Sequence, residues 1–293
     1  MDERTALSVL ADRLGPVGDD AAVVDDLVVT IDMLHESTDF PAGTTRYTAG
    51  WRAVGASLSD IAAMGADPVA AVAVYAAPSL QNEELLAFVD GARDVCEAVG
   101  GEYVGGDLDE HPEFSAATAA VGRTDTPVLR SGAQAGDVVC VTGTLGRTAG
   151  ALALFADGEA DRGNDLFQFV PRVAAGRVLG QYATAMMDSS DGLARSLHQL
   201  AEASDVGIAI DSPLPIDDVV EEVAADETER QELGVFFGED FELVCAIEPE
   251  EVAAAREASP VRLTPIGHVT ADKSVTLAGD SLPDRGYTHG EAE

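Results

Sequence analysis

Two carboxylates stand three residues apart in the segment Met187-Asp188-Ser189-Ser190-Asp191-Gly192-Leu193. The apolar run before Asp188 predicts a strand, and leucines at helical spacing after Gly192 predict a helix. Acids at such a turn can converge on one point, and oxygen ligands suit a hard cation such as magnesium. The alternative is an N-cap with a carboxylate that interacts with the helix dipole.

The same arrangement recurs along the chain, which favours the metal interpretation. Acids at the ends of predicted elements, mostly flanked by glycines, are Asp19, Asp20, Asp32, Asp60, Asp107, Asp188, Asp191 and Glu239. Gathered carboxylates repel one another unless a cation lies among them. Several magnesium ions in turn indicate phosphate chemistry. Each single acid, Asp60 included, also has a plainer explanation as a cap or a surface residue.

The elements that would position these acids alternate between strand and helix. In the first half we expect helices over 3–14, 44–64 and 82–99, and strands over 21–24, 27–31, 68–76, 102–104 and 116–121. Asp32 would then end the second strand, and Gly105-Gly106-Asp107 would follow a short strand. Residues 127–136 resemble a linker, so we place a domain boundary near residue 125.

The second half begins with a strand over 138–141 that enters the turn Thr142-Gly143-Thr144-Leu145-Gly146. Such a turn can bind phosphate through backbone amides, or can simply start a helix. We expect an alanine-rich helix next, helices over 171–182, 191–203 and 249–258, and strands over 184–187, 206–210, 241–247, 261–268 and 274–277. Residues 214–235 would be mostly helical and solvated, and the chain from about Arg285 loosely held.

The charge excludes some partners. Acidic residues number 53 against 17 basic ones, a net charge of −36 that would repel nucleic acid and anionic membranes. Spread acidity with a single lysine, Lys273, predicts adaptation to high salt, although an ordinary acidic protein remains the alternative. Cys96, Cys140 and Cys245 are far apart in apolar surroundings, which predicts free buried thiols. No signal peptide or long apolar segment is visible, so we expect a cytoplasmic protein.

A nucleotide site would have to work without a phosphate-binding lysine. Lys273 falls in a predicted terminal hairpin, and the turn after residue 141 lacks the Gly-Lys-Ser/Thr of a Walker A loop. Metal ions and arginines would therefore neutralise the phosphates. Arg130, in Leu129-Arg130-Ser131-Gly132, is the best placed.

Taken together, these motifs resemble the thiamine-monophosphate kinase family. The segments that carry the resemblance run in order from about residue 15 to residue 290: Gly18-Asp19-Asp20-Ala21-Ala22-Val23, Thr30-Ile31-Asp32, Leu58-Ser59-Asp60-Ile61-Ala62-Ala63-Met64-Gly65-Ala66, Gly105-Gly106-Asp107, Arg130-Ser131-Gly132, Val141-Thr142-Gly143-Thr144-Leu145-Gly146, Asp188-Ser189-Ser190-Asp191-Gly192-Leu193 and Gly238-Glu239-Asp240-Phe241-Glu242-Leu243.

The resemblance implies a mixed α/β (α+β) fold of the aminoimidazole ribonucleotide synthetase type in two domains. The first, 1–125, would bind metal and ATP and pair with a second subunit in a homodimer, and the second, 126–293, would be a separate α+β layer. It implies a cluster of several Mg²⁺ ions on Asp20, Thr30, Ile31, Asp32, Asp60, Asp107, Asp188 and Asp191. It also implies that Gly106, Asp107, Arg130 and Ser190 bind ATP, and that Glu239 contacts thiamine phosphate.

Three positions depart from the family pattern. Ile31 replaces a residue that usually carries a hydroxyl, so one metal would lose an oxygen ligand or take a backbone carbonyl. Asp39 stands where the family commonly has a histidine that contacts the substrate, and Asp284 where it often has an aromatic residue. These changes bear on the substrate pocket more than on phosphoryl transfer.

The residues and the resemblance agree on a mechanism. A phosphate monoester has a second pKa of about 6, so the acceptor is already anionic and needs no general base. We expect direct in-line transfer from ATP to thiamine phosphate, with no catalytic residue beyond the metal site. The alternatives are a sister ATP-dependent synthetase, such as an enzyme for a purine precursor or selenophosphate, and a non-catalytic Mg-nucleotide-binding protein. None of the three cysteines lies in a Gly-rich N-terminal segment, which disfavours selenophosphate synthesis.

Overall fold

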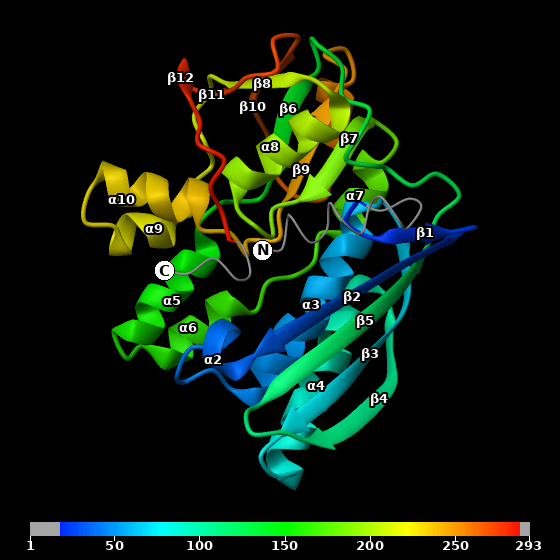
Figure 1. Ribbon diagram of the computed structural model, residues 1–293, viewed down its shortest axis with the longest axis vertical. Coiled ribbons are helices and arrows are strands. Elements are labelled where there is room, and N and C mark those ends of the chain that lie inside the picture. The colour runs from blue at the N-terminus through cyan, green and yellow to red at the C-terminus, as the bar shows by residue number, and fades with distance from the viewer. Residues whose placement is uncertain (1–17, 288–293) are drawn as a thin grey trace.

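The computed structural model describes residues 18–287 and shows two sheets, one from each half of the chain (Figure 1). The first sheet has the order β1-β2-β5-β3-β4, and all its neighbours are antiparallel except β3 and β4. Its strands are β1 (Ala22–Val24), β2 (Leu27–His35), β3 (Asp67–Ala77), β4 (Glu102–Glu110) and β5 (Ser115–Arg123).

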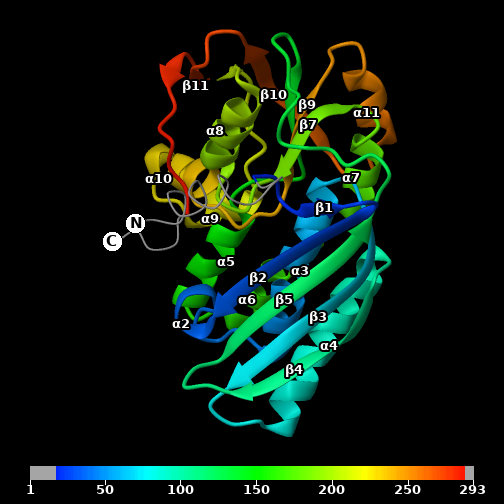
Figure 2. The same ribbon diagram turned by 45° about the vertical axis from the view of Figure 1, so that its right-hand side comes forward.

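Helices α3 (Arg46–Ala63) and α4 (Asn82–Val99) cover one face of this sheet, and the short α2 (Glu36–Asp39) follows β2. The two long helices approach closely at Gly50 and Gly91, where a Cβ atom would lie 2.0 Å from the carbonyl oxygen of Phe88 or Tyr47. Only glycine permits this spacing. Figure 2 looks onto the opposite face, which no helix within residues 18–287 covers.

The second sheet has the order β12-β11-β8-β10-β6-β9-β7. Its strands are β6 (Val138–Thr142), β7 (Ala183–Asp188), β8 (Gly207–Ile210), β9 (Leu243–Ile247), β10 (Leu263–Thr270), β11 (Val275–Leu277) and β12 (Asp280–Ser281). Helix α8 (Leu193–Ser204) packs on one face, while α7 (Val173–Leu179) and α11 (Val252–Ala258) pack on the other. The remaining helices are α5 (Arg147–Ala156), α6 (Ala160–Phe167), α9 (Asp218–Val223), α10 (Glu227–Gln231) and the π-helical turn η1 (Glu232–Phe236).

The two halves share hydrophobic cores. Phe155 and Phe167 of the second half pack in the core of the first sheet, while Ala62 and Ala63 at the end of α3 pack under the second sheet. The expected separate C-terminal layer is therefore joined to the first half through α3. This packing fixes the position of α3 relative to both sheets.

Several sequence predictions are confirmed and several are wrong. The long helices and the hairpin at Asp25-Asp26 are as expected, and the three cysteines are free and buried. Asp32 lies inside β2 and Asp107 inside β4, because both strands run beyond their predicted ends. Sequence reasoning missed α6. The predicted helix over 3–14 lies outside the described residues, and no helix in 18–287 is long and apolar enough to span a membrane.

The chain around Arg285 is held, contrary to expectation. Arg285 forms an ion pair with Glu232 and stacks over the ring of Phe236 at 4.5 Å. The backbone N–H of Tyr287 donates to the carbonyl of Asp191 at 3.1 Å. The end of the described chain is thus fastened to the turn that carries Asp188 and Asp191.

Candidate active site

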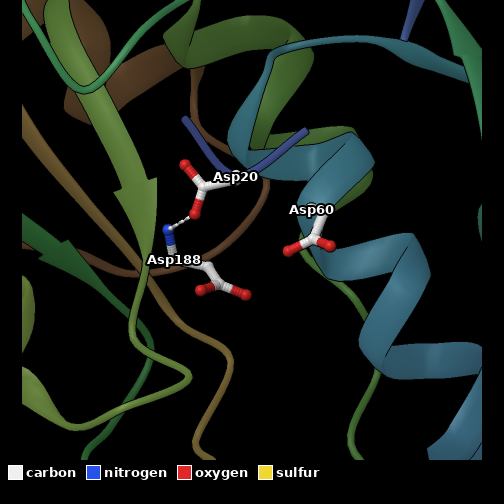
Figure 3. Close-up of side chains that lie close together, drawn as sticks. All are labelled: Asp20, Asp60 and Asp188. Carbon is white, nitrogen blue, oxygen red and sulfur yellow. Dashed lines mark hydrogen bonds between the residues drawn. The ribbon is translucent and has the colours of Figure 1, made fainter. Parts of the chain in front are cut away.

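Three carboxylates from distant parts of the sequence meet at the junction of the two halves (Figure 3). Asp20 precedes β1, Asp60 lies on α3, and Asp188 ends β7. One oxygen from each lies within 4.8 Å of the other two, and the N–H of Asp188 donates to Asp20 at 3.4 Å. The donor set is oxygen only, which suits a hard divalent cation.

A hydroxyl from another element orients two of these three carboxylates, and Arg130 orients the third, Asp20. Thr30 of β2 donates to Asp60, and Ser59 of α3 donates to Asp188 at 2.6 Å. Asp32 lies beside the three and accepts from Ser57 of α3 at 2.6 Å. Such second partners fix the direction in which a ligand oxygen points.

Burial and mutual repulsion disfavour the charged form of these carboxylates. Burial, followed by the charges of Asp32, Asp188 and Asp20, raises the pKa of Asp60 well above its ordinary value. Burial and then the charge of Asp20 raise the pKa of Asp188 to about 7. Burial also raises the pKa of Asp32. A bound cation would relieve this repulsion, so the residues present fit a magnesium site.

Arg130 borders the cluster. Its guanidinium donates to both oxygens of Asp20, at 3.0 and 3.2 Å, and its backbone N–H donates to Asp19 at 2.7 Å. It also lines an open cavity of about 380 Å³ together with Ser131 and Gln199. A cationic side chain at a cavity mouth next to the carboxylates can bind phosphate oxygens.

A second cavity, of about 470 Å³, lies between α2, η1 and the end of the described chain. Acidic and aromatic side chains line it, among them Asp39, Glu232, Glu239, Phe40, Phe236, Phe237 and Tyr287. This combination suits a ligand with a positively charged aromatic ring. Because the resemblance implies that Glu239 contacts thiamine phosphate, we call it the acceptor cavity.

Comparisons with known proteins agree with this geometry. Residues 18–124 match the N-terminal domain of AIR synthase related proteins, and residues 134–280 match their C-terminal domain. The thiamine-monophosphate kinase of Halobacterium salinarum is 64% identical over 99% of this chain and 100% of its own, and that of Methanospirillum hungatei is 40% identical over 99% of both. The chain belongs to the thiamine-monophosphate kinase family.

Solved structures support the same membership. The thiamine-monophosphate kinase of Stenotrophomonas maltophilia superposes with a TM-score of 0.81 at 30% identity, covering 94% of this chain and 95% of that one. A complex of AaThiL with AMPPCP and TMP has a TM-score of 0.89 at 27% identity, covering 98% of this chain and 97% of that one. The halobacterial relative is consistent with the high-salt interpretation of the acidic surface.

Within a single chain, the structure leaves three of the predicted metal ligands, Asp107, Ile31 and Asp191, outside the group formed by Asp20, Asp60 and Asp188. Asp107 is exposed and pairs with Val74 on the uncovered face of the first sheet. A bulge at Gly105, with φ +131°, precedes it, and a Cβ on Gly106 would lie 1.7 Å from the carbonyl of Ala73. Ile31 is 76% exposed on the same face, and its hydrocarbon side chain has no donor atom, so only its backbone carbonyl could be a ligand.

Of the three residues predicted to contact the substrate, two line the acceptor cavity and one does not. Asp39 and Glu239 line the acceptor cavity. Asp39 also accepts hydrogen bonds from the N–H of His35 at 2.6 Å and the hydroxyl of Thr38 at 2.8 Å, which hold it in place. Asp284 is outside the lining and pairs with Arg195 at 3.1 Å.

The turn that contains Asp188 and Asp191 connects the carboxylate cluster to the acceptor cavity. Its Ser190 donates its N–H to Asp188 at 3.1 Å and accepts the N–H of Glu239 at 2.6 Å. Asp191 accepts from Gln199 at 3.4 Å and lies outside the group of three carboxylates.

Sequence reasoning missed several residues of the site. Ser57 and Ser59 are hydroxyls on the buried side of α3, next to Asp60, and that placement was a usable signal. Phe236, Phe237 and Tyr287 carried no signal, because cavity lining depends on how α2, η1 and the chain end meet. Arg52, buried on α3, was also missed, because its contact with Glu239 depends on how the two halves of the chain pack.

Proposed function

We propose that this protein transfers the γ-phosphoryl group of ATP to thiamine phosphate and so forms thiamine diphosphate. Relatives named thiamine-monophosphate kinase align over the whole chain. One observation in the structure carries the proposal further: Ser190 is bonded both to Asp188 of the carboxylate cluster and to Glu239 of the acceptor cavity. A phosphate-transfer site and an acceptor site are therefore adjacent.

Magnesium ions would be held by Asp20, Asp60 and Asp188, which fit a hard cation by donor type and spacing. Asp32 and Thr30 stand beside them as further oxygen donors. Asp191 and the carbonyl of Ile31 remain predictions. When bound, magnesium would neutralise phosphate charge during transfer.

The residues of this chain act by orientation. An acceptor monophosphate is anionic near neutral pH, so it requires no base. Arg130, at the mouth of the smaller cavity, would bind the phosphates of ATP, with Ser190 nearby on the turn. The acidic and aromatic walls of the acceptor cavity would hold the thiazolium and pyrimidine rings so that the phosphate faces the cluster.

A homodimer through the first sheet is part of this proposal. Its uncovered face carries exposed apolar side chains, among them Val29, Met33, Val72, Val74 and Val104. Contiguous apolar surface of this kind is typical of an interface. Gly106 and Asp107 belong to β4, the edge strand that also carries Val104. In a homodimer through this sheet, their predicted part in ATP binding would depend on the second subunit. The three buried thiols suit a reducing cytoplasm, where we place the protein.

The test is ADP formation in molar potassium chloride with magnesium, ATP and one acceptor at a time. Thiamine phosphate should support turnover, whereas thiamine and a purine-precursor ribonucleotide should not. Stabilisation by magnesium-ATP without ADP from any acceptor would instead indicate a binding protein. Transfer from ATP made chiral at the γ-phosphorus should invert configuration, and net retention would exclude direct transfer.

A further inference from the structure

Glu239 lies in a strained stretch of backbone. Its φ is +57°, and that of Phe241, two residues later, is +53°. Residues with a side chain rarely adopt this left-handed conformation, because the Cβ atom then crowds the carbonyl oxygen. Such a conformation persists only where surrounding contacts hold it.

Three elements supply those contacts. The N–H of Glu239 donates to Ser190 at 2.6 Å, and its carbonyl accepts from the hydroxyl of Thr148 at 2.6 Å and from Arg52 at 3.3 Å. Its carboxylate Oε2 accepts from the same Nη2 of Arg52 at 2.8 Å. Both the backbone and the side chain of Glu239 are therefore held by Arg52.

Arg52 is itself immobilised. Its side chain is 1% exposed, and the guanidinium stacks over the ring of Phe167 at 3.7 Å. Its Nη1 donates to the carbonyl of Phe167 at 3.0 Å, and the rings of Phe169 and Phe241 lie within 5.5 Å. A buried cation held this way keeps its Nη2 in a fixed position against Glu239 and against the hydroxyl of Thr148, which it reaches at 3.3 Å.

We propose that Arg52 is a positioning residue that fixes Glu239 for recognition of the cationic ring of the acceptor, an inference that rests on the proposed function. Glu239 lines the acceptor cavity and its side chain stays 25% exposed there while Oε2 is bound to Arg52. Because Arg52 belongs to α3, which also carries Asp60, the contact ties the acceptor site to the carboxylate cluster. Fixing the carboxylate before binding removes an ordering cost from acceptor binding.

The test is a double-mutant cycle of Arg52→Met and Glu239→Gln in molar potassium chloride. The readouts are kcat, the KM of each substrate and calorimetric binding of thiamine phosphate without ATP. Each single variant should weaken thiamine phosphate binding about tenfold while the KM for ATP changes less than about twofold. The double variant should be no weaker than the weaker single one, because both remove the same interaction. Arg52→Lys should recover part of the loss.

Gln168→Leu is the matched control. The side-chain amide of Gln168 donates at 2.9 Å to Thr48, which lies one turn before Arg52 on α3, and no side-chain hydrogen bond joins Gln168 to Glu239 within residues 18–287. The Gln168→Leu variant should have a lower melting temperature and unchanged affinity for both substrates. Thr148→Val removes the hydroxyl that donates to the carbonyl of Glu239 and accepts from Arg52 at 3.3 Å, but leaves the Arg52–Glu239 ion pair in place. It should therefore weaken thiamine phosphate binding in the same direction by a smaller factor. It also tests the proposal if Arg52→Met does not fold.

Additive effects in the cycle, or equal losses for both substrates, would reduce Arg52 to a structural residue. The same holds if Gln168→Leu weakens thiamine phosphate binding as much as Arg52→Met. A wild-type protein that forms no ADP with thiamine phosphate would overturn the proposed function, and this inference with it.

Discussion

The carboxylate cluster and the acceptor cavity adjoin one turn of the chain, yet they balance charge in opposite ways. In the cluster, Asp60 and Asp188 face other carboxylates, and hydroxyls direct them without neutralising them. In the cavity, Glu239 is paired with the buried guanidinium of Arg52. Arg130 pairs with Asp20, but no cationic side chain within residues 18–287 forms an ion pair with Asp60 or Asp188. A cation from outside the chain would balance those two carboxylates, whereas Glu239 has its cationic partner as soon as the protein folds.

Asp60→Asn should have the largest effect of the variants that test this contrast. It should lower kcat by about a thousandfold or more, because a metal-binding charge is lost while the side chain keeps its shape. The metal-free melting temperature should stay level or rise, since one buried like charge is removed. Turnover near that of the wild type at saturating magnesium would show that Asp60 is a structural cap.

Ser59→Ala should have the next largest effect. Ser59 directs Asp188 without being a predicted ligand, so its loss should weaken metal binding about tenfold to a hundredfold. Manganese titration followed by electron paramagnetic resonance measures this directly. Thr184→Val is the control, because it removes a similar 2.6 Å hydroxyl–carboxylate bond, to Asp137, elsewhere in the second sheet. Equal losses in both variants would mean a general packing effect.

A pH titration sharpens the contrast further. The pKa of Asp188 is about 7, so protons compete with the metal below that value. Manganese affinity should fall by about tenfold or more from pH 8 to pH 6, because Asp188 takes up a proton in place of the metal and the raised pKa of Asp60 acts in the same direction. Thiamine phosphate affinity should follow only the acceptor's own phosphate ionisation. Metal affinity that is flat over this range would contradict the electrostatic account of the cluster.

The same shift has a consequence for stability. Asp188 and Asp240 both have a pKa raised to about 7, chiefly by burial. A raised carboxyl pKa means that the folded state holds a proton that the unfolded state releases. The metal-free protein should therefore gain stability as pH falls from about 7 to about 4. Asp240→Asn should remove part of this dependence and leave the pH dependence of metal binding intact.

Of the changes considered, salt concentration should have the smallest effect on the carboxylate cluster and on the acceptor cavity. A chain with net charge −36 repels itself when screening is weak, and the proposed dimer would join two such surfaces. The melting temperature should fall from molar salt to about 0.1 M, where the screening length is roughly 10 Å. Magnesium with ATP should restore part of it by mass action. Melting and sedimentation against potassium chloride measure this, and a flat melting temperature would remove the high-salt interpretation only.

The carboxylates of the cluster were within reach of sequence reasoning. Asp20 and Asp188 stand at element ends that apolar runs and glycines mark, and Asp60 sits beside the apolar side of a long helical pattern. Asp32 and Asp107 were placed wrongly at strand ends, because alternating and glycine-rich sequence does not show where a strand stops. Pairing with β5 carries β2 on to His35, and pairing with β3 carries β4 on to Glu110.

The sequence by itself determined the residue chemistry: an acidic surface, oxygen-only ligands, no phosphate-binding lysine, and the order of the long helices and most strands. Tertiary structure decided which residues meet. Asp107 and Ile31 fall on the uncovered face because side chains alternate along a strand, and a strand's register depends on its partners. Arg52 reaches Glu239 across 187 residues because α3 packs against both halves, a contact that no local pattern contains.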